Sequence, residues 1–360
     1  MIVDDSAVVR GLLARWLDAD GEIEVVRSVG DGAQAIANLA AAGAEVAILD
    51  INMPVLGGID ALPKLLAAQP HLKVLISSTL TRRNAIISLK ALSLGAADYV
   101  PKPETVRGVT TSEDFKNELI AKIKTLGALA RSEMQAGQPA ESRTAEEGEA
   151  LAPRHRAIRL RQAAQTQPQI LAIGSSTGGP QALMKFFSEA GGRIDVPIVV
   201  TQHMPPTFTS ILAEQIARAG NAPAREAENG DVLAPGTIYV APGGYHLTVR
   251  RTGAGAASVV LDEGPAENFC KPAVDPMFRS LATAFGAGVL GIVLTGMGHD
   301  GRDGARQITT AGGTILVQDQ ATSVVWGMPG SVAEAGYASA VLPLTEMAPK
   351  VLGLLRGRPI

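Results

Sequence analysis

A serine at position 176 lies where a sequence can place a nucleophile. It belongs to the segment Gly174-Ser-Ser-Thr-Gly178, which follows an apolar run over residues 170–173 and precedes apolar residues at helical spacing. The glycines predict a tight turn between a buried strand and a helix. Such a corner exposes the serine hydroxyl beside a helix N-terminus, where developing negative charge is stabilised. Ser176 is therefore a candidate nucleophile.

A serine nucleophile needs a base and an acid that orients the base. His203 directly follows the strand-like run 197–201, so it is the best placed of the five histidines. Asp300 lies in a glycine-rich turn after the apolar run 289–294, where its carboxylate could fix the tautomer of an imidazole. The backbone amide of Met297 in the same turn is a candidate donor to an oxyanion.

Each of these residues, taken singly, suits a structural role as well as a catalytic one. Their shared position at the ends of three predicted strands favours catalysis. The chain order Ser–His–Asp differs from the Ser–Asp–His order of standard α/β-hydrolases, which share the G-x-S-x-G corner. We interpret Asp303 as a helix N-cap and His246 as a structural residue or a substrate contact.

A second group of polar residues follows the predicted strands of the first 130 residues. Asp4, Asp5 and Asp50 come at strand ends, which can be neighbours in a parallel sheet. Three carboxylates in one pocket repel each other unless a hard cation such as Mg²⁺ is bound. A carboxylate beside Mg²⁺ can accept a phosphoryl group, whose oxygens Ser77 and Lys102 could bind. The alternative is that each aspartate only ends a strand in a turn.

Two segments of alternating strands and helices must position these residues. The alternation predicts α/β folds with parallel sheets, whose ligands gather at the carboxyl ends of the strands. The expected strands lie at residues 2–3, 24–29, 46–49, 73–77 and 97–100, and then at 169–173, 197–201, 236–241, 258–261, 289–295 and 313–317. Apolar periodicity fades between the segments. We therefore predict domains at 1–130 and 168–360, joined by a flexible linker at 131–167.

The composition favours a two-domain protein that binds neither nucleic acid nor a membrane. The 360 residues are 46% hydrophobic and carry a net charge of −3, which gives no electrostatic reason to expect either partner. The apolar runs are too short to span a bilayer, and we expect no signal peptide. The single cysteine excludes an internal disulfide and suggests a reducing compartment. We therefore expect a soluble cytoplasmic protein.

The first segment resembles the response-regulator receiver domain. The resemblance rests on four motifs, Val3-Asp4-Asp5-Ser6, Leu49-Asp50-Ile-Asn-Met-Pro54, Ile76-Ser77-Ser78 and Tyr99-Val-Pro-Lys102. It implies a flavodoxin-like domain with a parallel five-stranded sheet. Only three residues precede the aspartate pair, fewer than receivers usually carry. Either the start of the sequence is truncated, or the first strand is very short and the metal site is less well held.

The receiver resemblance also implies a role for each polar residue. Asp50 would accept the phosphoryl group, Ser77 and Lys102 would sense it, and Tyr99 corresponds to the switch aromatic of the family. The implied ligands of Mg²⁺ are Asp5, Asp50 and the carbonyl of Asn52, with Asp4 assisting through water.

The whole chain resembles the chemotaxis protein-glutamate methylesterase (CheB) family. The motifs of the second segment are Ile173-Gly-Ser-Ser176-Thr-Gly-Gly179, Thr201-Gln-His203-Met-Pro205, Tyr239-Val-Ala-Pro-Gly243, Leu294-Thr-Gly-Met-Gly-His-Asp300-Gly301 and Val325-Trp-Gly-Met-Pro329. The resemblance implies a doubly wound, mainly parallel α/β hydrolytic domain. Its nucleophile, base and acid would be Ser176, His203 and Asp300, with the Met297 amide at the oxyanion. His299 stands where we expect asparagine, so the pH response could differ.

By this resemblance the protein hydrolyses glutamate methyl esters on chemoreceptors, releases methanol and also deamidates receptor glutamines. Phosphorylation by the chemotaxis histidine kinase would activate it. Mg²⁺ is expected in the receiver and no cofactor at the hydrolytic site. The residues alone leave two alternatives, a receiver-gated serine amidase with a small substrate and a receiver-gated binding protein such as a transcription regulator. The lack of a basic recognition helix argues against the second alternative.

Overall fold

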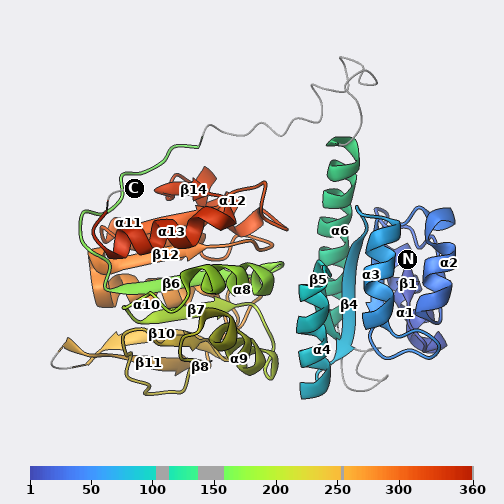
Figure 1. The fold of residues 1–360 in the computed structure, drawn as a ribbon, viewed down its shortest axis with the longest axis horizontal. Helices are drawn as coiled ribbons and strands as arrows, with labels where there is room; N and C mark the ends of the chain where they lie inside the picture. The colour runs from blue at the N-terminus through green and yellow to red at the C-terminus, as the bar shows by residue number, and fades with distance from the viewer. Residues whose placement is uncertain (103–112, 137–157, 253–254, 359–360) are drawn as a thin grey trace, which may run out of the picture. The chain divides into compact units, whose positions relative to one another are not determined.

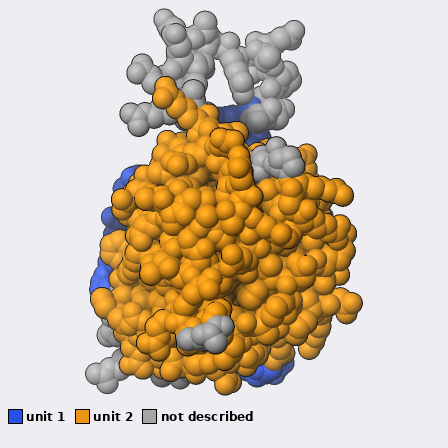
Figure 2. Space-filling model, turned by 90° about the vertical axis from the view of Figure 1, so that its left-hand side faces the viewer, with its two compact units in different colours: residues 1–154 blue, residues 155–360 orange. Residues whose placement is uncertain are grey.

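The computed structural model describes residues 1–102, 113–136, 158–252 and 255–358, which belong to two compact units (Figures 1 and 2). The first unit spans residues 1–154 and the second spans 155–360. Helix α6 (Glu113–Ala136) ends inside the segment predicted as a linker, most of whose remaining residues lie outside those described. No helix within the described ranges is long and apolar enough to cross a membrane.

The first unit is built on a five-stranded sheet in the order β2-β1-β3-β4-β5, with every pair parallel. Its strands are β1 (Ile2–Val3), β2 (Ser28–Val29), β3 (Val46–Asp50), β4 (Lys73–Thr79) and β5 (Asp98–Lys102). The helices are α1 (Ala7–Asp18), α2 (Gly32–Ala42), α3 (Gly58–Ala68), α4 (Arg82–Ser93) and α6. This strand order is that of the flavodoxin-like fold, so the predicted fold class is confirmed.

The second strand of the first unit is shorter than predicted. Only Ser28 and Val29 of the expected strand 24–29 pair with β1, opposite Ile2 and Val3. Strand β1 has only these two residues, so it offers β2 no further partners. The short β2 follows from the length of β1.

The second unit contains a seven-stranded parallel sheet in the order β14-β13-β12-β6-β7-β9-β8. Its strands are β6 (Ile170–Ser175), β7 (Ile198–Gln202), β8 (Ala224–Glu226), β9 (Ile238–Val240), β12 (Val289–Val293), β13 (Thr314–Gln318) and β14 (Ala340–Leu342). The chain extends the sheet from β6 first in one direction and later in the other. The carboxyl end of β6 is therefore a topological switch point, where ligands of such folds bind.

Two layers of helices enclose the seven-stranded sheet. Helices α8 (Gly179–Ala190), α9 (Phe208–Gly220) and α13 (Leu344–Leu355) pack together, whereas α10 (Val274–Phe285) packs on α11 (Arg302–Thr310) (Figure 1). Ile170 and Ala172 of β6 share a core cluster with Phe278 of α10 and with helix α12 (Gly327–Glu334). Alternate residues of a strand face opposite sides, so β6 is covered on both faces. The expected doubly wound α/β fold is confirmed.

An antiparallel hairpin, β10 (His246–Arg251) with β11 (Ala257–Asp262), adds to the parallel sheet. Strand β11 was predicted, but the edge strands β8 and β14 were not. The edge strands have three residues each, which is too short for a recognisable periodicity. Helix α10 packs against β10, so the hairpin supports the helix that begins beside the candidate site.

Candidate active site and phosphorylation site

Ser176 and His203 lie next to each other at the carboxyl ends of two paired strands. Strands β6 and β7 run in register up to the pair Ser175 and Gln202, so the next residue of each strand leaves the sheet at the same edge. The His203 amide donates to the Ser175 carbonyl at 3.1 Å, which joins the two strand ends. The predicted nucleophile and base are thus placed together by sheet register.

The backbone around Ser176 is held on both sides. The amide of Ser176 donates to the Thr295 carbonyl at 3.0 Å, and its carbonyl accepts from Gln202 Nε2 at 2.9 Å. Gln202 Oε1 also accepts from the Ser175 hydroxyl at 2.7 Å. A Cβ at Gly296 would lie 2.9 Å from the Ser176 Cβ, so only glycine lets this turn approach the serine so closely.

The imidazole of His203 contacts an acid on one side and a thiol on the other. Its Nε2 lies 2.7 Å from Asp300 Oδ2, and its Nδ1 lies 3.3 Å from Cys270 Sγ. Among the described residues, no hydrogen bond joins the ring to the Ser176 hydroxyl. Since Asp300 accepts from Nε2–H, the neutral ring carries its lone pair on Nδ1. This nitrogen is therefore the one that can accept a proton.

Asp300 is almost fully buried, with 2% exposure, and receives hydrogen bonds from several segments. Its Oδ2 accepts from the Val274 amide at 2.6 Å, and its Oδ1 accepts from the amides of Asp275 at 3.1 Å and Gly301 at 2.9 Å. Burial would raise the pKa of Asp300, but the pair with His203 and these amides outweigh burial and lower it to about 2. The carboxylate is therefore charged at neutral pH.

Asn268 joins Asp300 to a second buried acid. Its Nδ2 donates to Asp300 Oδ1 at 2.9 Å and to Asp275 Oδ2 at 3.0 Å. Burial and the charge of Asp300 raise the pKa of Asp275 to about 6. One amide group thus supplies a hydrogen to each of two carboxylates that repel each other. We infer that Asn268 is a positioning residue for the acid of the site.

The surroundings of His203 act on its pKa in opposite directions. Burial lowers the pKa, whereas negative charge on Cys270 and the hydrogen bond to Asp300 raise it, and the net result is about 10. The contribution of Cys270 requires a thiolate. When Cys270 is an uncharged thiol, this contribution disappears and the imidazole loses its proton at a lower pH.

The other residues singled out from the sequence lie apart from this hydrogen-bond cluster. His246 is buried, accepts from the Ala273 amide at 3.1 Å and lies 2.9 Å from the Pro265 carbonyl, as a structural histidine does. His299 is exposed. The prediction that Asp303 is a helix N-cap is wrong, because Gly301 occupies that position and Asp303 lies in the first turn of α11. Met297 is partly buried in the turn between β12 and Asp300.

Sequence reasoning missed three residues that touch the candidate triad. Asn268 and Cys270 belong to the loop between β11 and α10, and Asp275 lies in the first turn of α10. The loop has no apolar periodicity that could be recognised in the sequence. Of the three, only Asp275 had a feature recognisable in the sequence, because acids are common in the first turn of a helix.

The first unit brings Asp50 together with Lys102 and Asp4. Lys102 Nζ donates to Asp50 Oδ1 at 2.8 Å and to Asp4 Oδ2 at 2.5 Å, and all three residues are buried. Burial raises the pKa of Asp50 and outweighs the opposite effect of the Lys102 ammonium. Burial would lower the pKa of Lys102, but the charges of Asp50 and Asp4 outweigh burial and raise it.

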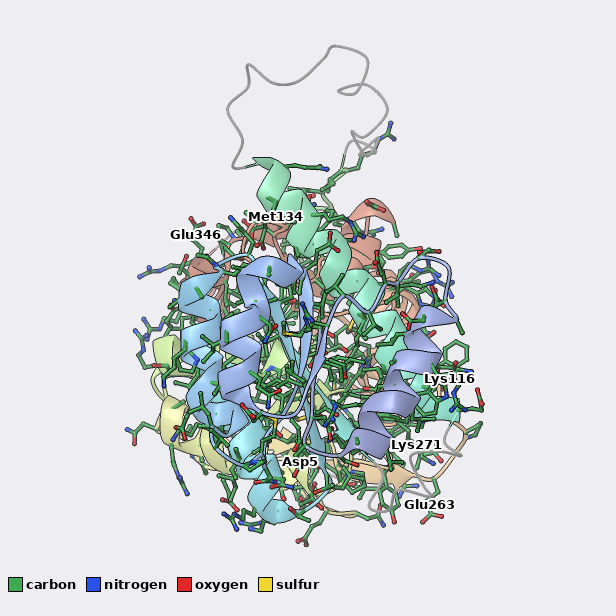
Figure 3. The ribbon with its side chains drawn as sticks, turned by 90° about the vertical axis from the view of Figure 1, so that its right-hand side faces the viewer. Asp5, Lys116, Met134, Glu263, Lys271 and Glu346 are labelled. Carbon is green, nitrogen blue, oxygen red and sulfur yellow. The ribbon has the colours of Figure 1, made fainter. Side chains whose placement is uncertain are left out.

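Ser77 and the predicted metal ligands surround this ion-pair cluster. Ser77 pairs with Asp50 in the sheet, and its buried hydroxyl has no hydrogen-bond partner among the residues that the structure describes. The Asn52 amide donates to Asp50 Oδ2 at 3.2 Å, and Asp5 is exposed just after β1 (Figure 3). Within the described ranges, no cluster of three or more metal-ligating side chains is assembled. The Lys102 ammonium instead bridges Asp4 and Asp50.

Comparisons with known proteins show the family of each unit. Residues 171–351 match the CheB methylesterase family, and residues 1–112 match the response regulator receiver domain. The chain is 50% identical, over 99% of its length and 94% of the relative, to a protein-glutamate methylesterase/protein-glutamine glutaminase of Nitrobacter hamburgensis. A protein-glutamate methylesterase/protein-glutamine glutaminase of group 2 operon from Rhodopseudomonas palustris is also 50% identical, over 99% of this chain and 94% of that relative. The crystal structure of the Thermotoga maritima CheB methylesterase catalytic domain is 39% identical with a TM-score of 0.51, and covers 52% of this chain and 100% of that one.

The positioning role of Asn268 predicts a loss of catalysis in Asn268→Gly. Glycine tolerates the positive φ of 52° at this position, so the variant removes the amide while the backbone keeps its conformation. A hydrogen bond to a charged group contributes about 1.5–3 kcal/mol, so kcat/KM should fall about tenfold or more. Asn229→Gly removes another loop amide, bound to the Leu261 amide, and is the control. Equal kcat/KM in Asn268→Gly and wild type would contradict the role.

The contact between Cys270 and His203 predicts a shift in the pH dependence of hydrolysis. The base must be neutral to accept a proton, so kcat/KM rises as the pH increases through the pKa of His203. Cys270→Ala removes the group whose negative charge, when ionised, raises this pKa, so the rise should move to lower pH by about one unit. Cys270→Ser keeps a hydrogen-bond partner without a readily ionised group and should shift the same way. An unshifted profile in both variants would contradict the coupling.

Proposed function

Since this chain belongs to the CheB methylesterase family and carries a receiver domain, we propose that Ser176, His203 and Asp300 are the residues with which it hydrolyses glutamate methyl esters. The enzyme is a carboxylic ester hydrolase that acts in chemotaxis adaptation. The pairing of His203 with Asp300 at the strand end beside Ser176 carries the proposal.

The geometry supports a two-step acyl transfer. His203 Nδ1 accepts the proton of the Ser176 hydroxyl while Oγ attacks the ester carbonyl. The imidazolium then donates this proton to the departing methoxide, and methanol leaves an acyl-enzyme. Water attacks the acyl-enzyme with His203 again as base, which restores the serine and leaves the substrate side chain as a free glutamate carboxylate. Asp300 stabilises the imidazolium in both steps.

An oxyanion forms in each step and needs preorganised donors. The turn after β12 approaches Ser176 through Gly296, and we assign the backbone amide of Met297 as one donor. The same site would hydrolyse a glutamine side chain with ammonia as the leaving group. The names of the relatives, which include protein-glutamine glutaminase, support this second activity.

Cys270 is a second nucleophile within reach of His203, since its Sγ lies 3.3 Å from Nδ1. A Cys–His–Asp arrangement can also carry out acyl transfer. The strand–turn–helix corner favours Ser176, because Gly178 has a φ of 76° and helix α8 begins directly after it. Cys270 lies instead in the loop between β11 and α10, and no helix begins directly after it.

The choice between the two nucleophiles predicts opposite results for two variants. Ser176→Ala should lower kcat for methanol release from radiomethylated receptor by at least about 10³-fold, because the attacking oxygen is gone. Cys270→Ala should retain activity, since the thiol only contacts the base. The measurement is release of labelled methanol at the pH optimum of each variant. An active Ser176→Ala together with an inactive Cys270→Ala would contradict the assignment.

The receiver supplies the control of this activity, and we assign Asp50 as its phosphoryl acceptor. The buried hydroxyl of Ser77, which has no partner within the described part of the chain, and the ammonium of Lys102 support this, because both could bind phosphoryl oxygens beside Asp50. The phosphodonor would be the chemotaxis histidine kinase and the substrates methyl-accepting chemoreceptors.

The oxygen donors around Asp50 fit Mg²⁺ by their chemistry. Asp5 and Asp50 would contribute carboxylates and Asn52 its carbonyl, with Asp4 acting through water. Mg²⁺ would neutralise the charge that gathers as the phosphoryl group is transferred. Lys102, which now bridges Asp4 and Asp50, would then be available to the phosphoryl oxygens.

The role of Asp50 predicts that Asp50→Asn abolishes stimulation by acetyl phosphate in the presence of Mg²⁺. The amide cannot form the acyl phosphate, so methanol release should be the same with and without the phosphodonor. Asp60→Asn removes an exposed acid of the first turn of α3 and should keep the stimulation. Chelation of Mg²⁺ should remove stimulation from wild type. Unchanged stimulation in Asp50→Asn would place the acceptor elsewhere.

A further inference from the structure

A tight turn at residues 267–270 presents one aromatic side chain beside the catalytic residues. Glu267 and Cys270 pair through two backbone hydrogen bonds of 3.1 and 2.9 Å. The φ angles of the central residues Asn268 and Phe269 are 52° and 62°. Two successive positive φ angles between paired residues are typical of a type I′ turn. Phe269 is fully exposed, at 104% of its reference area.

Phe269 occupies a position that the turn does not favour for it. The sequence preferred at the centre of a type I′ turn is Asn-Gly, and Asn268 fits the first position. A bulky side chain in the left-handed region strains the backbone. Single exposed apolar residues are ordinary on protein surfaces. The Phe269 side chain buries no area and strains its backbone, so stability of the fold does not explain why phenylalanine stands at this position.

The other residues of the turn are fixed, and they hold Phe269 in place. Asn268 binds Asp300 and Asp275, and Cys270 contacts His203. Glu267 forms two hydrogen bonds with the Arg279 guanidinium, at 2.8 and 2.5 Å. Backbone strain persists where the surroundings over-determine a conformation, and such positions cluster at functional sites.

The chain after the turn is tied down as well. Lys271 Nζ donates to the carbonyls of Glu263 and Gly264 at 3.1 Å each, and Lys271 and Glu263 are both visible in Figure 3. The backbone that carries Phe269 is therefore held in one conformation. Preorganisation reduces the entropy that binding costs, and aromatic groups of this kind are typical anchors of protein interfaces.

We propose that Phe269 is an anchor for the polypeptide substrate, which packs an apolar side chain near its methylated glutamate against the exposed ring. The proposal rests on the proposed function and names the surface that distinguishes a receptor from a small ester. Asn268 and Cys270, on either side of Phe269, contact Asp300 and His203, so a chain that covers Phe269 lies close to this site. The substrate must reach this site in every catalytic cycle.

The test is the variant Phe269→Gly in the full chain. Glycine relieves the strained backbone, so Tm should rise by roughly 2–4 °C. The ratio of kcat/KM for methylated receptor to kcat/KM for p-nitrophenyl acetate should fall about tenfold, mainly through the KM for receptor. Phe269→Leu keeps an apolar side chain and should retain most of the ratio. Val232→Ala truncates another exposed apolar side chain of the same unit and is the control.

Three results would overturn the proposal. An unchanged ratio in Phe269→Gly, with wild type active on receptor, would refute the anchor and leave the proposed function intact. A large rise in hydrolysis of p-nitrophenyl acetate without phosphodonor would indicate that Phe269 instead binds the receiver of its own chain. Absence of methanol release by wild type would refute the proposed function itself, and this proposal with it.

Discussion

The second unit depends on one buried carboxylate, that of Asp300. Five donors reach it, which are His203 Nε2, Asn268 Nδ2 and the amides of Val274, Asp275 and Gly301. Helix α10 begins after Ala273, whose side chain cannot cap it, so Asp300 satisfies the first amides of the helix from another segment. A buried donor left without a partner costs about 1–3 kcal/mol, so the helix, the loop and the base all depend on this acid.

Sheet topology brings Asp300 to these partners. Strand β6 lies between β12 and β7, so Asp300 follows the strand on one side of Ser176 and His203 follows the strand on the other. The imidazole and the carboxylate meet across the end of β6. Because the strand order reverses at β6, three side chains that are distant in the sequence lie around the end of one strand. Their proximity follows from the order of the strands.

The parts that could be predicted from the sequence are those that follow from strand ends. Ser176, His203 and Asp300 each follow an apolar run, and parallel strands bring such ends to one edge, so their proximity was predictable. Asn268 and Cys270 reach the site from a loop without periodicity, and their contacts arise only when α10 packs. The short edge strands β8 and β14 were missed for a related reason, because pairing rather than local pattern defines them.

Asp300 of the second unit and Asp50 of the first unit accept hydrogen bonds from different kinds of donor, and each kind suits the role proposed for that aspartate. Asp300 is fixed mainly by backbone amides, which cannot leave, and its pKa is lowered to about 2, so it keeps one charge throughout a reaction cycle. Asp50 accepts from the Lys102 ammonium and from the Asn52 backbone amide, and burial raises its pKa. The role proposed for Asp50 is to gain and lose a phosphoryl group, which needs a partner that can move, and Lys102 has a long side chain that can do so. An orienting acid needs donors that cannot move.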